Sequence, residues 1–224
     1  MFVLDQIICA LDTSDLAVAT KTVQKLSPNI KHFKIGHSLT LAHSLSVIAI
    51  LQDAGAEKIF LDLKFHDIPN TVASAIKEAA KYGVWMTTLH TAGGPDMMKA
   101  AAEVSGRPLL MGVSVLTSLD EVSLAQIGVS RTIEDQMCRM SAMAIKCGID
   151  GLISSPLEIS LLRSEIGAKP LIVAPGIRLP GGESHDQKRI ATPQQAIADG
   201  ASYLVIGRAL SEAEDLDFVI NQLK

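Results

Sequence analysis

The sequence has few aromatic residues and no long run of like charge. Phe, Tyr and Trp make up 4% of its 224 residues, and 20 Lys and Arg stand against 24 Asp and Glu, for a net charge of -4. Without a lysine- or arginine-rich stretch, a nucleic-acid partner or a membrane surface is not expected. With so few rings, any ligand recognition should depend on hydrogen bonds and charge rather than on stacking.

Cysteines and long apolar runs are also scarce. The three cysteines, Cys9, Cys138 and Cys147, are odd in number and form no Cys-x-x-Cys, which excludes a disulfide framework. No apolar run is long enough to span a bilayer, and residues 1–5 lack the basic segment of a signal peptide. We therefore expect a cytoplasmic protein with reduced, mostly buried thiols.

What the chain does have is an alternation of short apolar runs and longer amphipathic stretches. Strands buried on both faces read as continuous apolar runs, which predicts parallel strands covered by helices. The predicted strands are 7–11, 32–35, 58–63, 84–89, 109–116, 151–154, 171–174 and 203–206.

The stretches between these runs place apolar residues at helical spacing, and several stop at a glycine. The clearest predicted helices are 15–26, 45–54, 72–82, 133–146 and 194–199. Thr13 or Ser14 could cap the first of them. Eight strand–helix units predict a (β/α)8 TIM barrel, with residues 1–224 forming a single domain. A doubly wound open sheet would use the same alternation, but no Gly-x-Gly-x-x-Gly follows the first strand.

Two stretches interrupt this rhythm. Residues 175–189 read PGIRLPGGESHDQKR and show no periodicity. A connection this long in a compact domain is usually functional, often a lid, although a tolerated surface insertion is the alternative. Residues 117–131 are polar and predict a loop with a short helix after the fifth strand.

Charged residues gather where the predicted strands end, and this is the end of a barrel that carries function. Asp62 and Lys64 are two residues apart on one strand, so their side chains should share a face, with Asp67 following and Lys34 on the neighbouring strand. Mutual pairing would keep these lysines and carboxylates ionised in a partly dry site. A structural ion-pair network is the competing interpretation, and Lys34 taken alone would be a solvated lysine.

A second signal lies after the eighth predicted strand, where Gly207 and Arg208 precede a helix. Loops after strands seven and eight of such barrels often bind phosphate, and the seventh loop adds Gly176, Arg178 and Gln187. These residues predict a phosphorylated small-molecule substrate. The six histidines form no His-x-His or His-Glu-x-x-His motif, so no metal is expected.

At these residues the chain resembles the orotidine 5'-monophosphate decarboxylase family. The run FLDLKFHDIPNT at 60–71 is similar to the family signature. Shorter matches run from the first strand to the last helix: ALD at 10–12, KIG at 34–36, LTS at 116–118, PGIR at 175–178, DQKR at 186–189 and IGR at 206–208.

The resemblance implies a function for each matching position. It implies decarboxylation of orotidine 5'-monophosphate in a homodimer, without metal or cofactor. Lys64 would protonate C6 of the pyrimidine, and Asp62 would lie against the substrate carboxylate. Further implied residues are Asp12 and Lys34 for the ribose, Thr117 and Ser118 for the pyrimidine, Arg178, Gln187, Gly207 and Arg208 for the phosphate, and Asp67, Ile68 and Thr71 for the partner's site.

Two rival functions make different demands on the charged residues. A sugar-phosphate decarboxylase or aldolase of the same superfamily would use Mg²⁺ and a glutamate where this chain has Lys34, and a lysine there would repel the ion. A non-catalytic binder of phosphorylated ligands would be expected to have lost Lys64 or a carboxylate. Neither rival fits the residues present as well as the decarboxylase.

Overall fold

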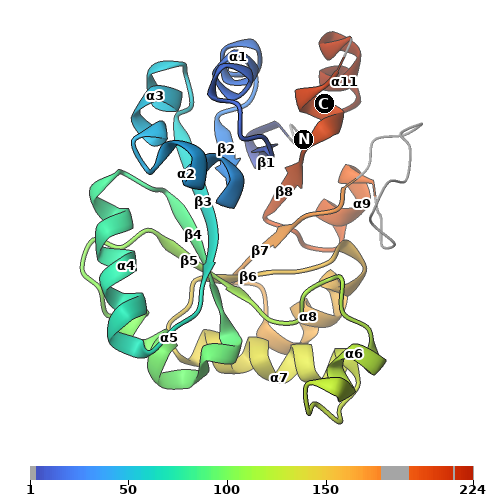
Figure 1. The fold of residues 1–224 in the computed structure, drawn as a ribbon. Helices are drawn as coiled ribbons and strands as arrows, with labels where there is room; N and C mark the ends of the chain where they lie inside the picture. Colours follow the sequence, from blue (N-terminus) through green and yellow to red (C-terminus); the bar gives the residue numbers. More distant parts are fainter. Residues whose placement is uncertain (1–3, 178–191, 214, 224) are drawn as a thin grey trace.

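The computed structural model describes residues 4–177, 192–213 and 215–223 (Figure 1). Eight parallel strands close into a barrel in chain order, and the closure pairs Ile7 of the first strand with Leu204 of the last. The predicted (β/α)8 barrel is thereby confirmed. The strands are β1 (Ile7–Leu11), β2 (His32–Ile35), β3 (Lys58–Phe65), β4 (Met86–His90), β5 (Leu109–Val113), β6 (Gly151–Ile153), β7 (Leu171–Ala174) and β8 (Tyr203–Ile206).

Helices surround the barrel (Figure 1). They are α1 (Leu16–Leu26), α2 (His37–His43), α3 (Val47–Asp53), α4 (Pro69–Lys81), α5 (Gly94–Ala102), α6 (Glu121–Gln126), α7 (Ile133–Lys146), α8 (Ile159–Ile166), α9 (Pro193–Ala198), α10 (Arg208–Ser211) and α11 (Leu216–Gln222). Three 3-10 turns complete the set: η1 (Leu4–Gln6), η2 (Thr91–Gly93) and η3 (Pro156–Glu158).

The cap of α1 differs from the prediction. Asp15, rather than Thr13 or Ser14, is the N-cap, because its carboxylate accepts the N–H groups of Ala17 and Val18 at 2.8 and 3.1 Å. The Thr13 hydroxyl instead accepts the N–H of Asp15 and so helps to hold the capping residue in place. The short helix predicted after the fifth strand is present as α6.

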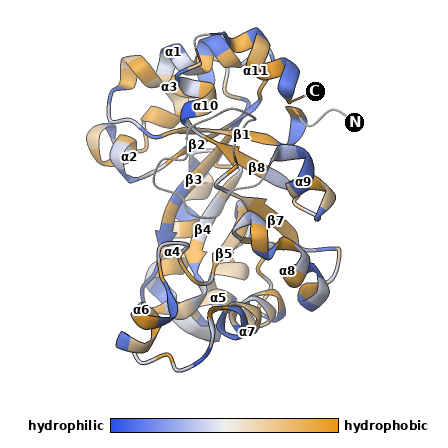
Figure 2. Ribbon diagram, turned by 90° about the vertical axis from the view of Figure 1, so that its right-hand side faces the viewer, coloured by the Kyte–Doolittle hydropathy of each residue, from blue (hydrophilic) through white to orange (hydrophobic). Residues whose placement is uncertain are grey.

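Apolar residues form two separate cores, one inside the barrel and one between the barrel and the helices. Figure 2 shows β1, β7 and β8 largely hydrophobic, whereas the surrounding helices carry both colours. The outer core is the larger and includes Leu61 of β3. The inner core is small and consists of Ile8, Ala10, Phe60, Met86, Met111, Val173 and Val205. Because side chains alternate along β3, Phe60 inside places Asp62 inside as well.

Aromatic rings fill the amino-terminal end of the barrel. Trp85 lies 4.6 Å from His32 and 5.1 Å from Tyr203, measured between ring centroids. The ammonium of Lys58 lies 5.2 Å from the Trp85 ring centroid. Trp85 and Tyr203 also pack against the inner core. These rings therefore cover the inner core at the end of the barrel opposite the predicted site.

Arginine side chains brace the loops at this same end. The guanidinium of Arg163 donates to the carbonyl oxygens of Gly200, Gly167 and Pro170 at 2.6 to 3.1 Å. Arg107 forms an ion pair with Asp150, whose carboxylate also accepts the N–H of Leu110. Over the ranges that the structure describes, no helix is long and apolar enough to cross a membrane.

Candidate active site

A cavity of about 1030 Å³ opens at the carboxyl-terminal ends of the strands. Its walls include seven of the predicted site residues: Asp12, Lys34, Asp62, Lys64, Thr117, Gly207 and Arg208. Ser118, Asp67, Ile68 and Thr71 are not part of its lining. Arg178 and Gln187 lie outside the described residues. The cavity thus brings the strand-end charges together with Gly207 and Arg208, two of the residues predicted to bind phosphate.

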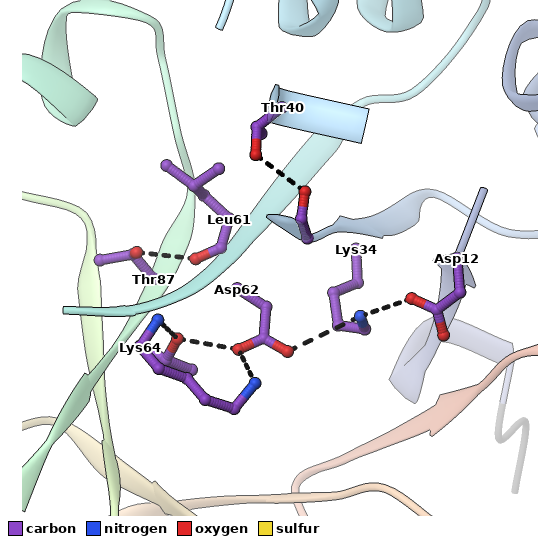
Figure 3. Close-up of polar contacts among 9 residues, drawn as sticks. Asp12, Lys34, Thr40, Leu61, Asp62, Lys64 and Thr87 are labelled. Atoms are coloured by element: carbon purple, nitrogen blue, oxygen red, sulfur yellow. Dashed lines mark hydrogen bonds and ion pairs between the residues drawn. The ribbon is translucent and has the colours of Figure 1, made fainter. Parts of the chain in front are cut away.

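Four charged side chains form a row at the carboxyl-terminal ends of β1, β2 and β3 (Figure 3). The Lys34 ammonium lies 3.0 Å from the Asp12 carboxylate and 3.6 Å from Oδ2 of Asp62. The Lys64 ammonium lies 2.9 Å from Oδ1 of Asp62. We call Asp12, Lys34, Asp62 and Lys64 the charge row. Its signs alternate, so each inner member has an opposite charge on both sides.

Burial of Lys34 corrects the prediction of a solvated lysine. Its side chain is 12% exposed, and that of Asp62 is 15% exposed. A charged group this deep is expensive to hold unless it is paired, and Lys34 is paired with two carboxylates. Lys34 taken alone was expected to be solvated because its two partners, Asp12 and Asp62, are 22 and 28 positions away in the sequence.

The pKa of Asp62 is lowered by its neighbours. Burial alone would raise this pKa, but the charges of Lys34 and Lys64 and the hydrogen bonds from Lys64 and Thr88 outweigh burial. Asp62 is therefore ionised at neutral pH, as the pairing argument predicts. The nearby Cys9 behaves in the opposite way: burial, with the negative charge of Asp12, raises the pKa of its thiol to about 12. Cys9 is consequently not a nucleophile at neutral pH.

The backbone at Lys64 is unusual. Its φ is 50°, in the left-handed region that non-glycine residues rarely occupy, and the pairing of β3 with β4 shifts register between Leu61 and Phe65. Such a conformation costs on the order of 1–3 kcal/mol and persists only where surrounding contacts impose it. Here the main-chain N–H of Lys64 donates to the Thr88 hydroxyl of β4 at 2.8 Å. The strained position thus coincides with one of the two lysines of the charge row.

Asp67, Ile68 and Thr71 lie apart from the charge row within this chain. The Asp67 carboxylate accepts the N–H of Ile68 at 2.6 Å, and all three side chains are exposed, Ile68 at 67%. Among the described residues no ion pair joins Asp67 to Lys34 or Lys64. Within this chain, Asp12 rather than Asp67 is the second carboxylate that alternates with the two lysines.

Gly207 and Arg208 follow β8 on the far side of the charge row from Lys64. A Cβ added at Gly207 would meet Ala10 and Asp12 only at 3.8 and 3.9 Å, which is ordinary contact. Packing within the protein therefore does not require glycine here, and the open space faces the cavity that Gly207 lines. Arg208 begins α10 and is exposed.

The site offers no cluster suited to a metal ion. Within the described part of the chain, no group of three or more His, Cys, Asp or Glu side chains could hold one. His66 and His90 stack with ring centroids 5.4 Å apart. Burial, helped by the charges of His66 and Lys64, lowers the pKa of His90, so its ring is neutral at neutral pH.

Comparisons with known proteins show which family the chain belongs to. A family model described as "Orotidine 5'-phosphate decarboxylase / HUMPS family" matches residues 5–222. The chain belongs to this family. Its relatives include the orotidine 5'-phosphate decarboxylases of Vibrio cholerae, 41% identical over 223 residues (97% of this chain and 96% of that one), and of Pseudomonas fluorescens, 46% identical over 214 residues (93% and 91%).

A solved structure places the same fold in the family. The crystal structure of orotidine 5'-phosphate decarboxylase from Lactobacillus acidophilus superposes with a TM-score of 0.85 and 35% identity, covering 98% of this chain and 97% of that chain. The family resemblance read from the 60–71 run is thus confirmed over nearly the whole length.

Three polar residues of this family member escaped the sequence analysis. Thr88 binds both Asp62 and Lys64, and its only sequence signal was a polar residue inside an apolar strand. Ser154 and Ser155 line the cavity after β6, and the Ser155 hydroxyl is buried without a hydrogen-bond partner among the described residues. Two serines at the end of an apolar run were the signal for these.

Proposed function

We propose that this chain decarboxylates orotidine 5'-phosphate to uridine 5'-phosphate and CO2, the last step of de novo pyrimidine synthesis. The observation that carries the proposal is the charge row in the cavity wall, in a chain of this family. The relatives from Vibrio cholerae and Pseudomonas fluorescens are orotidine 5'-phosphate decarboxylases. The three cysteines are free, which suits a reducing cytoplasm.

The proposed chemistry needs one carboxylate and one ammonium beside the reacting carbon. The bond between C6 and the carboxylate breaks, CO2 leaves, and the electron pair stays on C6. The Lys64 ammonium donates its proton to C6, and the resulting amine regains a proton from water. Asp62 repels the substrate carboxylate more than it repels neutral CO2, and only such a difference between ground and transition state raises the rate.

The rest of the nucleotide is assigned along the same cavity. Asp12 and Lys34 would hold the ribose hydroxyls, and Thr117 would meet the pyrimidine. Ser118 is also assigned to the pyrimidine, but it is not part of the cavity lining and its assignment rests on the sequence resemblance alone. Gly207 and Arg208 would bind the phosphate, where a bidentate arginine contact is favourable. The assignments of Arg178 and Gln187 to the phosphate rest on the sequence resemblance alone.

The reaction is proposed to need neither metal nor cofactor. Lys34 supports this, because its ammonium lies between the carboxylates of Asp12 and Asp62, where a divalent cation of the superfamily rival would need oxygen ligands. A positive charge that is already fixed there would repel the ion. In this proposal Lys34 and Lys64 supply the positive charge that a metal ion would otherwise bring.

The active form is proposed to be a homodimer in which Asp67 completes the partner's site, with Ile68 and Thr71 beside it. The exposure of all three residues supports this, because among the described residues Asp67 forms no ion pair and its carboxylate accepts only the main-chain N–H of the adjacent Ile68. Ile68 would leave an apolar side chain in water, and a second copy would bury it.

The deciding experiment mixes the purified protein with orotidine 5'-phosphate and a chelator and follows the ultraviolet spectrum. We expect the substrate spectrum to convert to that of uridine 5'-phosphate at an undiminished rate. Activity that disappears with chelator and returns with Mg²⁺ would instead favour the sugar-phosphate rival. No conversion under either condition would sink the proposed function.

A further inference from the structure

The Thr88 hydroxyl connects two members of the charge row. Thr88 lies on β4 and is fully buried. Its Oγ1 accepts the main-chain N–H of Lys64 at 2.8 Å and lies 2.9 Å from Oδ1 of Asp62. That same Oδ1 accepts the Lys64 ammonium at 2.9 Å. Backbone, hydroxyl, carboxylate and ammonium therefore close a ring that begins and ends on Lys64.

The direction of each hydrogen bond in this ring is fixed by its chemistry. A main-chain N–H can only donate, so Oγ1 of Thr88 must accept from Lys64. The ionised Asp62 carboxylate can only accept, so the single hydroxyl hydrogen of Thr88 points at Oδ1. Both capacities of the hydroxyl are used at once, and hydrogen bonds arranged in series strengthen one another.

The ring stands where the regular strand pairing is interrupted. Between Leu61 and Phe65 the register of β3 on β4 shifts, and Lys64 adopts its positive φ. The Lys64 N–H finds its partner in a side chain of β4 rather than in a β4 carbonyl. The Thr88 hydroxyl thus connects the main chain of Lys64 to the side chain of Asp62 at the place where the register of β3 on β4 shifts.

We propose that Thr88 is a positioning residue for the decarboxylation, holding the Lys64 ammonium and the Asp62 carboxylate in the relative orientation the reaction needs. The inference rests on the proposed function, since it names how the same site is held. Thr88 itself does not touch the reacting atoms in this account.

The neighbouring residue provides a matched control. Thr87 is also fully buried on β4, and its hydroxyl donates to the Leu61 carbonyl of β3 at 2.7 Å (Figure 3). It makes the same kind of contact between the same two strands but reaches no charged group. Thr87→Val and Thr88→Val therefore remove one buried hydroxyl each, and only the second removes a hydroxyl bound to the charge row.

We expect Thr88→Val to lower kcat by about 10- to 100-fold with KM changed far less, because a misplacement of about 1 Å at reacting groups can cost on the order of 10²-fold. The acid limb of the rate profile should move to higher pH, since ionised Asp62 loses a donor that favours its charged form. The charged groups that face Asp62 are Lys34 and Lys64, and the nearest other titratable groups are Asp12 and His90. All four residues are unchanged in these variants, so a shift of the acid limb reports the loss of the Thr88 hydroxyl. Thr88→Ser should restore both kcat and the acid limb.

The test measures kcat, KM and the pH profile on orotidine 5'-phosphate for wild type, Thr88→Val, Thr88→Ser and Thr87→Val, with a melting temperature for each. Thr87→Val should melt earlier yet keep the wild-type acid limb. An unshifted acid limb and near-wild-type kcat in Thr88→Val, with active wild type, would overturn the positioning role alone. Inactive wild type would instead overturn the proposed function.

A second variant covers the case in which Thr88→Val does not fold. Thr88→Cys keeps a small side chain but replaces the hydroxyl by a weak donor. It should shift kcat and the acid limb in the same direction by a smaller factor. Wild-type values for both would count against the proposal in the same way.

Discussion

The two ends of the barrel use charged side chains in different ways. At the carboxyl-terminal end Lys34 and Lys64 pair with the carboxylates of other side chains, inside a cavity. At the amino-terminal end Arg163 gives its N–H groups to main-chain carbonyls, beneath a layer of rings that includes Trp85. The first arrangement leaves groups that can exchange partners with a ligand, whereas Arg163 uses its donors to hold loops together. Substitutions at the two ends should therefore separate activity from stability.

The largest separation is expected for the two lysines Lys64 and Lys58. Lys64→Ala should lower kcat by on the order of 10³-fold or more, because it removes the proposed proton donor, while substrate binding persists. Lys58→Ala removes the cation above Trp85 at the other end and should leave kcat within about twofold, since such contacts contribute about 0.5–1 kcal/mol to stability. Steady-state rates and direct binding of uridine 5'-phosphate measure both. Near-wild-type turnover in Lys64→Ala would remove it from the mechanism.

A mixing experiment tests whether the carboxyl-terminal end is completed by a second copy. Asp67→Ala and Lys64→Ala should each be nearly inactive, yet a hybrid dimer contains one site with both residues intact. After full exchange of an equimolar mixture, about one site in four should be intact in a symmetric dimer. Activity should rise toward that fraction of wild type. If exchange is verified with labelled subunits and no activity returns, Asp67 acts in its own chain.

Arg208 tests how far the phosphate end of the cavity influences the charge row. Loss of a charged phosphate contact should cost roughly 2–4 kcal/mol by analogy with truncated charge pairs. Arg208→Ala should then lower kcat/KM by on the order of 10²-fold, at about 1.4 kcal/mol per tenfold. Orotidine without its phosphate should be a poor substrate that added phosphite dianion accelerates. If phosphite has no effect while inorganic phosphate competes normally with the substrate, the phosphate site contributes to substrate binding but not to the rate of the chemical step.

The amino-terminal end should show the reverse pattern when its ring layer is broken. Trp85→Ala removes contacts with both His32 and Tyr203 and leaves a cavity against the inner core. The free energy of unfolding should fall by about 2–4 kcal/mol, somewhat less than for a fully buried tryptophan. Well below the melting temperature, kcat should stay within about twofold. A large loss of kcat in folded protein would mean that the two ends are coupled.

The smallest expected effect is a pH dependence of stability at the same end. Burial, and after it the charge of Lys58, lowers the pKa of His32 below 6.5, against the weaker opposing influence of a hydrogen bond with the Ile7 main chain and of the charges of Asp5 and Glu57. The unfolded chain then binds more protons than the folded one, so this stability is lost as pH falls below about 6.5. His32→Phe keeps a ring in the layer and should lessen the fall in melting temperature between pH 7.5 and 5.5. An unchanged fall would exclude His32 as its source.

The strands differ in how well the sequence predicts their bounds. Four strands have the predicted bounds, β1, β2, β7 and β8. In β1 and β7 a continuous apolar run begins and ends with the strand. The third strand runs on to Phe65, beyond the predicted 63, because polar residues within it interrupt the pattern. The alternation of Asp62 and Lys64 on one face was readable from their spacing of two.

What sequence could not supply are contacts that depend on register between strands. Thr88 looks like any threonine in a strand, and its connection to Lys64 exists only because β3 shifts against β4. Asp15 was predicted as the first residue of the helix rather than its cap, because three adjacent polar residues could each have capped α1. Lys34 appeared solvated because its partners are far away in sequence. Each of these is decided by neighbours in space rather than by the residue itself.

The alternating signs of the charge row have a consequence for how this sequence can drift over generations. With two positive and two negative members, the row is neutral as a whole. Loss of Lys34 alone would leave the buried Asp62 carboxylate with Lys64 as its one cation in the row and would give the row a net negative charge, which is costly to bury. Loss of an adjacent pair, such as Lys34 with Asp12, restores neutrality. Single substitutions thus pass through an unbalanced intermediate, so members of the row should change in oppositely charged pairs or stay as they are.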